Sequence, residues 1–162
     1  MKKSDLKNLD KEQLINLIID LSKLSKENNA FLQTKLNKDY NKLFELSCNK
    51  ISKALSCYEL MSLRDARNTI TDFKKSNPEN NLLIELCLHY IKEAYDLEKT
   101  DWRFQENFYS AIEKVYNSIF ETIKKDISLK ERYLPEIKKL IQNSNEGWGH
   151  RDYLEDKMDE LK

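Results

Sequence analysis

Histidine is the side chain best suited to acid–base chemistry near neutral pH, and the chain has two, His89 and His150. Glu85 lies four residues before His89, so a helix would place both side chains on one face. One interpretation of this pair is an acid–base or metal site. The other is a structural histidine at the edge of the core, hydrogen-bonded to a neighbour. The chain has no Glu-x-x-His repeat and no zinc site built from several Cys and His residues at close spacing, so we expect no metal and no cofactor.

The segment from Glu146 to Asp152 holds both glycines of the chain, Gly147 and Gly149. Such a concentration predicts a tight backbone path with a positive φ at one glycine. The candidate ligand-binding residues are those that could meet a ligand there: Trp148, His150, Arg151 and Asp152. In the alternative interpretation, Gly147 ends one helix, Trp148 fills the core and Gly149 lets the last helix turn back.

A third candidate is a surface patch of basic side chains interrupted by two aspartates: Arg64, Arg67, Lys74 and Lys75. The 28 basic and 28 acidic residues of the chain balance, whereas a chain that neutralises many phosphates is usually clearly basic. Nucleic acid is therefore a disfavoured partner.

Other chemistry has no signature in the sequence. The chain has no phosphate-binding glycine-rich loop and no nucleophile elbow, so no catalytic residue is assigned. Cys48, Cys57 and Cys87 are odd in number and far apart, which favours a reducing compartment. No secretory signal and no apolar run of about 20 residues is present. We therefore expect a cytoplasmic protein without a membrane partner.

The elements that must position these residues are helices. Residues 80–97 are apolar around most of a helix circumference, which predicts a central helix covered on several sides. Residues 102–123 have a wide apolar face and follow after a short connection, so these two helices should be antiparallel neighbours.

Amphipathic spacing predicts the remaining helices. They cover 11–36 (as one helix or two), 40–58, 63–76, 133–141 and 153–161, with caps at Asp10, Asp39, Ser62 and Ser128. Asn77-Pro78 is expected to start the central helix, with Asn77 as its cap. Pro135 is a candidate break between a single turn and a helix.

The predicted fold is all-α, with seven or eight helices arranged as antiparallel hairpins. Two architectures fit, a solenoid-like stack and an irregular bundle, and no fixed repeat period distinguishes them. We expect a single domain over 1–162, with 1–36 packed more loosely.

Three motifs resemble a family of small all-helical bacterial proteins catalogued only as a domain of unknown function. They are the opening Ser4-Asp5-Leu6-Lys7 with Leu9–Leu14, the segment Ser62–Arg67 with Ile70-x-x-Phe73-Lys74-Lys75, and the run Gly147-Trp148-Gly149-His150-x-x-Tyr153-Leu154. The resemblance implies an all-helical protein of uncharacterised function and supplies no catalytic residue.

The sequence is most consistent with a protein that binds another protein, a peptide or a second copy of itself, without catalysis. Hairpin stacks offer a groove or a concave face to such a partner. The first alternative is a small-molecule or metal-dependent enzyme that uses His89 or His150. The second is weak nucleic-acid binding through Arg64–Lys75.

Overall fold

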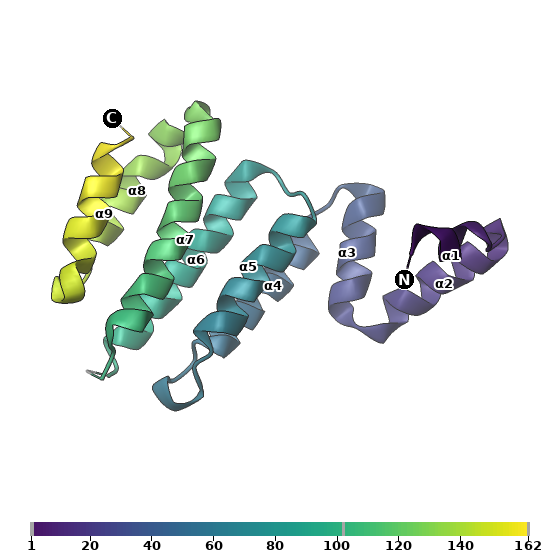
Figure 1. The fold of residues 1–162 in the computed structure, drawn as a ribbon, viewed down its shortest axis with the longest axis horizontal. Coiled ribbons are helices and arrows are strands. Elements are labelled where there is room, and N and C mark those ends of the chain that lie inside the picture. Colours follow the sequence, from purple (N-terminus) through teal and green to yellow (C-terminus); the bar gives the residue numbers. More distant parts are fainter. Residues whose placement is uncertain (1, 102, 162) are drawn as a thin grey trace. The chain divides into compact units, whose positions relative to one another are not determined.

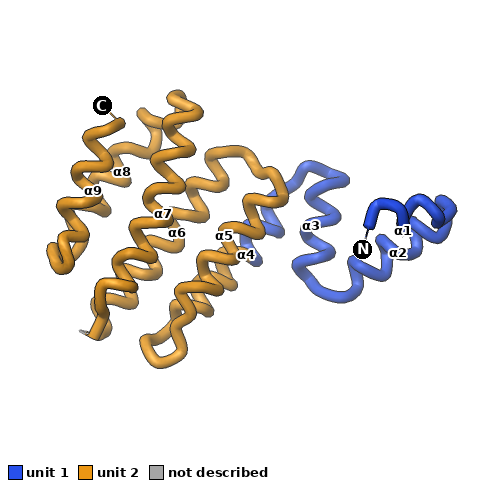
Figure 2. The backbone as a smooth tube through the Cα atoms, viewed as in Figure 1, with its two compact units in different colours: residues 1–46 blue, residues 47–162 orange. Residues whose placement is uncertain are grey.

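The computed structural model describes residues 2–101 and 103–161, and the fold is all-α as predicted. The described residues form nine α-helices, three short 3₁₀ turns and no strand. The chain separates into two compact units, residues 1–46 and residues 47–162 (Figure 2). Each unit is described by itself below, and the single domain over 1–162 with looser packing of 1–36 stays a prediction.

The first unit contains α1 (Lys3–Lys7), α2 (Lys11–Leu24) and α3 (Lys26–Asn37). The predicted capping box starts α2, because the Asp10 carboxylate accepts the Gln13 N–H at 2.8 Å and the Gln13 side chain accepts the Asp10 N–H at 3.0 Å. Ser25 then adopts an extended conformation (φ −154°), so the segment 11–36 forms two helices. The Ser25 hydroxyl caps α3 by accepting the Asn28 N–H at 3.0 Å.

Helix α4 (Asn41–Ala54) begins in the first unit and ends in the second. Lys38, with a left-handed φ of 56°, ends α3, and the Asp39 carboxylate then accepts the Asn41 N–H at 3.0 Å. Asp39 therefore caps α4 as the sequence predicted.

The second unit continues with α5 (Leu63–Lys75), α6 (Asn80–Glu98), α7 (Glu106–Lys125), α8 (Lys130–Gln142) and α9 (His150–Asp159). Figure 1 shows α5, α7 and α9 side by side, with α6 and α8 behind them. Helices α6 and α7 are neighbours that run in opposite directions, as their lengths and short connection predicted. None of the described helices is long and apolar enough to span a membrane.

The core of the second unit is centred on α6 and α7. Helix α6 buries ten residues and has apolar side chains on nearly every side, which confirms the central helix expected over 80–97. Helix α7 also buries ten residues, all on its broad apolar face. The largest fully buried side chains of the chain include four aromatic rings: Tyr90, Tyr116, Phe73 and Phe108.

Two predicted helix starts differ from the structure. Helix α6 begins at Asn80 with Glu79 as its N-cap, because Asn77 adopts a left-handed φ of 61° and belongs to the turn that follows α5. Helix α7 begins at Glu106, and the expected start at Trp102 lies outside the described residues.

The helix predicted around Pro135 also differs in two ways. Helix α8 runs through Pro135 without a break, since proline costs one backbone hydrogen bond here while the buried Tyr133, Ile137 and Ile141 hold the helix against the core. Ser128 does not cap it. The Ser128 hydroxyl instead donates to the Asp126 carboxylate at 2.6 Å.

Candidate functional site

The apolar face of α2 is the most exposed apolar surface that the described residues form. No residue of this helix is buried. Its exposed large apolar side chains have exposed fractions between 40% and 75%, and they are Ile15, Ile18, Ile19, Leu21 and Leu24. We call these five residues the α2 face, with Ile15, Ile18 and Ile19 close together on one side of the helix and Leu21 and Leu24 farther round its circumference. The adjacent helix α3 adds Phe31, 36% exposed, and Leu36, 74% exposed.

The second unit contrasts with this surface. Its exposed large hydrophobic residues among those described are Leu60, Ile127 and Trp148, which lie in three different turns. Single exposed apolar side chains are normal on soluble proteins, whereas a contiguous group usually marks a binding surface. The α2 face is therefore the candidate protein interface of this chain. The sequence predicted an amphipathic helix here, but neither the exposure of its apolar side chains nor the part taken by Ile15 and Ile19.

The α2 face belongs to a well-defined helix. The capping box at Asp10 fixes its start, and the Asn28 side-chain amide donates to the Leu21 carbonyl near its end at 3.1 Å. Helix α2 carries Glu12 in its first turn and Lys23 in its last turn. A capped helix with an apolar stripe presents its side chains at fixed helical spacing, which suits recognition by another helix.

The predicted ligand-binding residues of the C-terminal loop do not share one surface. Trp148 is 63% exposed, so the interpretation in which it fills the core is wrong. His150 is fully buried, Arg151 is half-buried and Asp152 is exposed. Gly149 has the predicted positive φ, 66°, and Trp148 before it is also left-handed at 59°. These two consecutive left-handed residues turn the tryptophan ring outward and the imidazole inward.

His150 takes part in a polar network inside the second unit. Its Nδ1 lies 2.9 Å from the Glu113 carboxylate, and its Nε2 lies 3.0 Å from the Tyr95 hydroxyl. Because a carboxylate only accepts, the Nδ1–H of His150 donates to Glu113, and Nε2 is in hydrogen-bond contact with the Tyr95 hydroxyl. The Tyr116 hydroxyl lies 3.4 Å from that of Tyr95. Burial is the main cause that raises the pKa of Tyr95 to about 12.

Arg151 completes the attachment of this loop. Its guanidinium donates to the Glu146 carboxylate at 2.6 Å and to the Ser144 backbone carbonyl. The Arg151 side chain therefore connects the start of α9 to the turn before it. The predicted ligand-binding residues of this loop thus contact different parts of the protein. Ligand binding by these loop residues stays a prediction.

His89 connects two helices of the second unit. Its Nε2 lies 3.0 Å from the Ser52 hydroxyl and 3.2 Å from the Cys48 backbone carbonyl, both on α4. The Glu93 carboxylate lies 3.9 Å from the same nitrogen. The sequence paired His89 with Glu85, but Glu85 instead accepts from Arg132 and Tyr133 of α8, each at 2.9 Å.

This arrangement differs from a catalytic triad, in which the nucleophile and the carboxylate bind opposite ring nitrogens. Here both Ser52 and Glu93 approach Nε2, and that nitrogen is also shared with a backbone carbonyl. His89 and His150 share no hydrogen-bond or ion-pair partner among the described residues, and catalysis by either histidine stays a prediction. Those residues contain no group of three or more His, Cys, Asp or Glu side chains placed to hold a metal ion.

Two of the cysteines are poor nucleophiles at neutral pH. Burial raises the pKa of the Cys87 thiol to about 12, with a smaller opposing effect from Lys74. Burial and then the nearby Glu93 charge raise the pKa of the Cys48 thiol to about 11. A thiol reacts through its thiolate, so both remain largely protonated at neutral pH.

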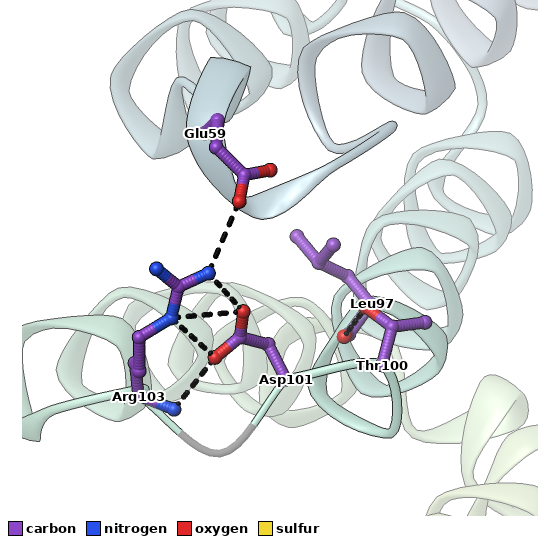
Figure 3. A network of polar contacts seen from close by, with 5 residues as sticks. All are labelled: Glu59, Leu97, Thr100, Asp101 and Arg103. Atoms are coloured by element: carbon purple, nitrogen blue, oxygen red, sulfur yellow. Dashed lines mark hydrogen bonds and ion pairs between the residues drawn. The ribbon is translucent and has the colours of Figure 1, made fainter.

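Arg103 has a structural role in the connection between α6 and α7. Its guanidinium contacts both carboxylate oxygens of Asp101 and donates to Glu59 at 3.0 Å (Figure 3). The guanidinium carbon also lies 4.2 Å from the centre of the Tyr58 ring. The connection between α6 and α7 is thereby attached to the turn at residues 58–60. The two carboxylates raise the pKa of Arg103 above its ordinary value.

The predicted basic patch divides into two parts. Arg64 and Arg67 line a groove between α5 and α7, where Lys114 of α7 joins them. Lys75 instead forms an ion pair with Asp72 at 2.8 Å, and Lys74 lines neither of the two hollows of this groove. The sequence missed Lys114, because the approach of α7 to α5 could not be read from the local pattern around residue 114.

Comparison of the chain with protein-family models, with curated proteins and with solved structures gives no match. Membership of the uncharacterised helical family stays a prediction.

Proposed function

We propose that this chain is a protein-binding module without catalytic activity, and that the α2 face is its binding surface. The observation that carries this proposal is the concentration of exposed isoleucine and leucine on one capped helix. An exposed apolar stripe of this kind is typical of a helix that packs against another apolar surface. We take a second copy of the chain as the first partner to test.

The exposed isoleucines of α2 support pairing with a second copy. In an antiparallel pair centred at the level of Leu17, Ile15 of one copy lies opposite Ile19 of the other, twice by symmetry. Both side chains are exposed in the single chain, so this register buries apolar surface of both copies.

The expected affinity of this pair is low. Completing the burial of a half-exposed isoleucine or leucine contributes about 1 kcal/mol, so the α2 faces of two copies contribute about 10 kcal/mol together. Association costs at least about 4 kcal/mol. The net binding free energy is therefore at most about 6 kcal/mol, which corresponds to a dissociation constant no tighter than about 10–100 μM. Such a contact would be reversible and would depend on concentration.

Sedimentation velocity of the full chain from 5 μM to about 1 mM tests this proposal. We expect a reversible monomer–dimer equilibrium that the substitution Ile18→Lys moves to monomer. The matched control is Leu60→Lys, which places the same charge at a residue that is 76% exposed in the second unit. This control should leave the equilibrium unchanged.

If the wild type stays monomeric over this whole concentration range, the proposal that a second copy of the chain is the partner is contradicted. Affinity purification with the wild type and with Ile18→Lys would then test a different protein partner. If the wild type retains no protein that is lost with Ile18→Lys, the α2 face is not a binding surface and the proposed function fails.

A further inference from the structure

The groove between α5 and α7 consists of two adjoining hollows of about 370 Å³ and about 530 Å³. Arg67 and Lys114 line both hollows, so the two form one continuous groove. Along α5 it extends from Leu63 to Thr71, a distance of about 12 Å at the helical rise. Five of its other side chains are uncharged and can form hydrogen bonds: Asn68, Thr71, Asn107, Ser110 and Ser118.

The basic side chains of this groove have no acidic partner in the part of the chain that the structure describes. The chain has five arginines. Arg103, Arg132 and Arg151 each form an ion pair with a carboxylate. Arg64 and Arg67 have none among the described residues, nor does Lys114, and all three line the same groove. Glu106 is the one acidic residue that lines the described groove, and it forms no recorded ion pair with them.

Two buried polar atoms near this groove also lack a partner. The Nε of Arg67 and the hydroxyl of Tyr90 are buried without a hydrogen-bond partner among the described residues. Tyr90 is fully buried, and the charge of Arg67 acts on its hydroxyl, so the two groups lie near each other. A buried donor without an acceptor is costly, so the Nε of Arg67 would gain from an acceptor brought by a ligand.

We propose that the α5–α7 groove is a binding site for an extended acidic peptide segment, separate from the α2 face. The guanidinium groups of Arg64 and Arg67 would hold carboxylates of that segment, and Lys114 would add a third positive charge. A planar guanidinium presents paired N–H donors that match the two oxygens of a carboxylate.

The composition of the groove favours a peptide over nucleic acid. None of its described lining residues is aromatic, so the groove offers no surface on which bases could stack. Asn68 and Asn107 supply both donors and acceptors, which match the alternating N–H and C=O groups of a peptide backbone. A length of about 12 Å accommodates about four residues of an extended chain.

Fluorescence anisotropy with the full chain and a labelled eight-residue peptide of alternating glutamate and serine tests the proposal. Saturable binding is expected at low salt, and a peptide with glutamine in place of every glutamate should bind at least tenfold more weakly. An oligonucleotide of eight thymidines, added as a competitor, is expected to displace little of the labelled peptide. If the glutamine peptide binds equally well, or no peptide binds, the proposal is overturned. Stronger binding of the oligonucleotide than of the acidic peptide would overturn it in favour of nucleic acid.

Variants locate the binding site. Arg67→Gln should weaken binding of the glutamate peptide at least about tenfold, because it removes a charged fork from the centre of the groove. Arg67 is half-buried, so the exposed pair Arg64→Gln and Lys114→Gln provides a second variant that leaves the fold intact, with a similar expected loss. The matched control, Lys138→Gln with Lys139→Gln on α8, removes the same charge from exposed positions and should leave binding unchanged.

Equal losses in the groove pair and in the α8 pair would show that binding follows net charge alone, and would overturn the site. Ile18→Lys on the α2 face should bind the peptide as the wild type does. A failure of the groove is thereby distinguished from a failure of the proposed protein-binding function.

Discussion

Helices α2 and α6 have similar apolar residues but opposite surroundings. Helix α6 buries ten residues, and Ile84, Leu86 and Ile91 have no exposed surface. Helix α2 buries none, although isoleucine and leucine make up seven of its fourteen residues in the sequence KEQLINLIIDLSKL. The free energy that holds α6 in place comes from side-chain packing, whereas α2 depends on its cap and on α3. The comparison teaches that an apolar stripe predicts a helix, and that only packing decides whether the stripe becomes core or interface.

The largest effect should separate the two helices directly. Leu86→Ala in α6 should lower the free energy of unfolding by about 2–5 kcal/mol, since it leaves a cavity in a closely packed core. Ile18→Ala in α2, where the side chain is 46% exposed, should cost less than about 1 kcal/mol in the monomer. Urea denaturation followed by circular dichroism at low protein concentration measures both. Equal costs would mean that α2 is packed in solution as tightly as α6.

An intermediate effect is expected at alkaline pH. Burial raises the pKa of Tyr95 to about 12, with hydrogen bonds from Tyr116 and Ser144 opposing it. Since the folded state holds this proton more tightly than the unfolded state, the stabilisation is complete below pH 10. It falls as the pH rises through 12, by about 3 kcal/mol in total. Urea midpoints at pH 9, 10.5 and 11.5 should therefore decrease.

The variant Tyr95→Phe serves as the control for this alkaline transition. It cannot ionise at this position, so its urea midpoint should decrease less steeply with pH than that of the wild type. Hydrogen exchange should show protection lost in α6 and α7, while α2, which contains no tyrosine, changes little. Parallel pH profiles for the wild type and the variant would remove Tyr95 as the cause.

The smallest effect concerns the helix caps. Asp10→Ala and Ser62→Ala each remove a side-chain acceptor from the start of a helix, α2 in the first case and α5 in the second. Each loss should cost about 1 kcal/mol. Because α2 has little packing to hold it, Asp10→Ala should reduce helix content below the melting transition. Ser62→Ala should instead lower the melting temperature of the second unit with its helix content unchanged. Circular dichroism during heating distinguishes these outcomes, and identical melting curves would contradict the contrast.

Local pattern was sufficient to predict the helices of the second unit. Residues 80–97 are apolar on nearly all sides, and such a helix is stable in water only when it is covered, so α6 could be placed before its neighbours were known. The cap at Asp10 was also predictable, since its acceptor and the Gln13 donor are three residues apart.

Properties that depend on distant residues could not be predicted in the same way. Lys114 joins Arg64 and Arg67 only through the packing of α7 against α5. The inward position of His150 depends on two left-handed residues before it, and a left-handed tryptophan is uncommon. The exposure of α2 could not be predicted either. Its periodicity identifies an apolar face, but it does not say whether another element covers that face.

The contacts from Glu113 through His150 to Tyr95 have a consequence for the alignment of three helices. They connect α7, α9 and α6 where the imidazole is fully buried and packs against the Tyr109 ring. Contacts between apolar side chains constrain the position of a helix only weakly, because one methyl group can replace another at little cost in free energy. A displacement of α9 by one turn would leave the buried imidazole of His150 without hydrogen-bond partners, which is costly. The two hydrogen bonds therefore select a single register for the last helix.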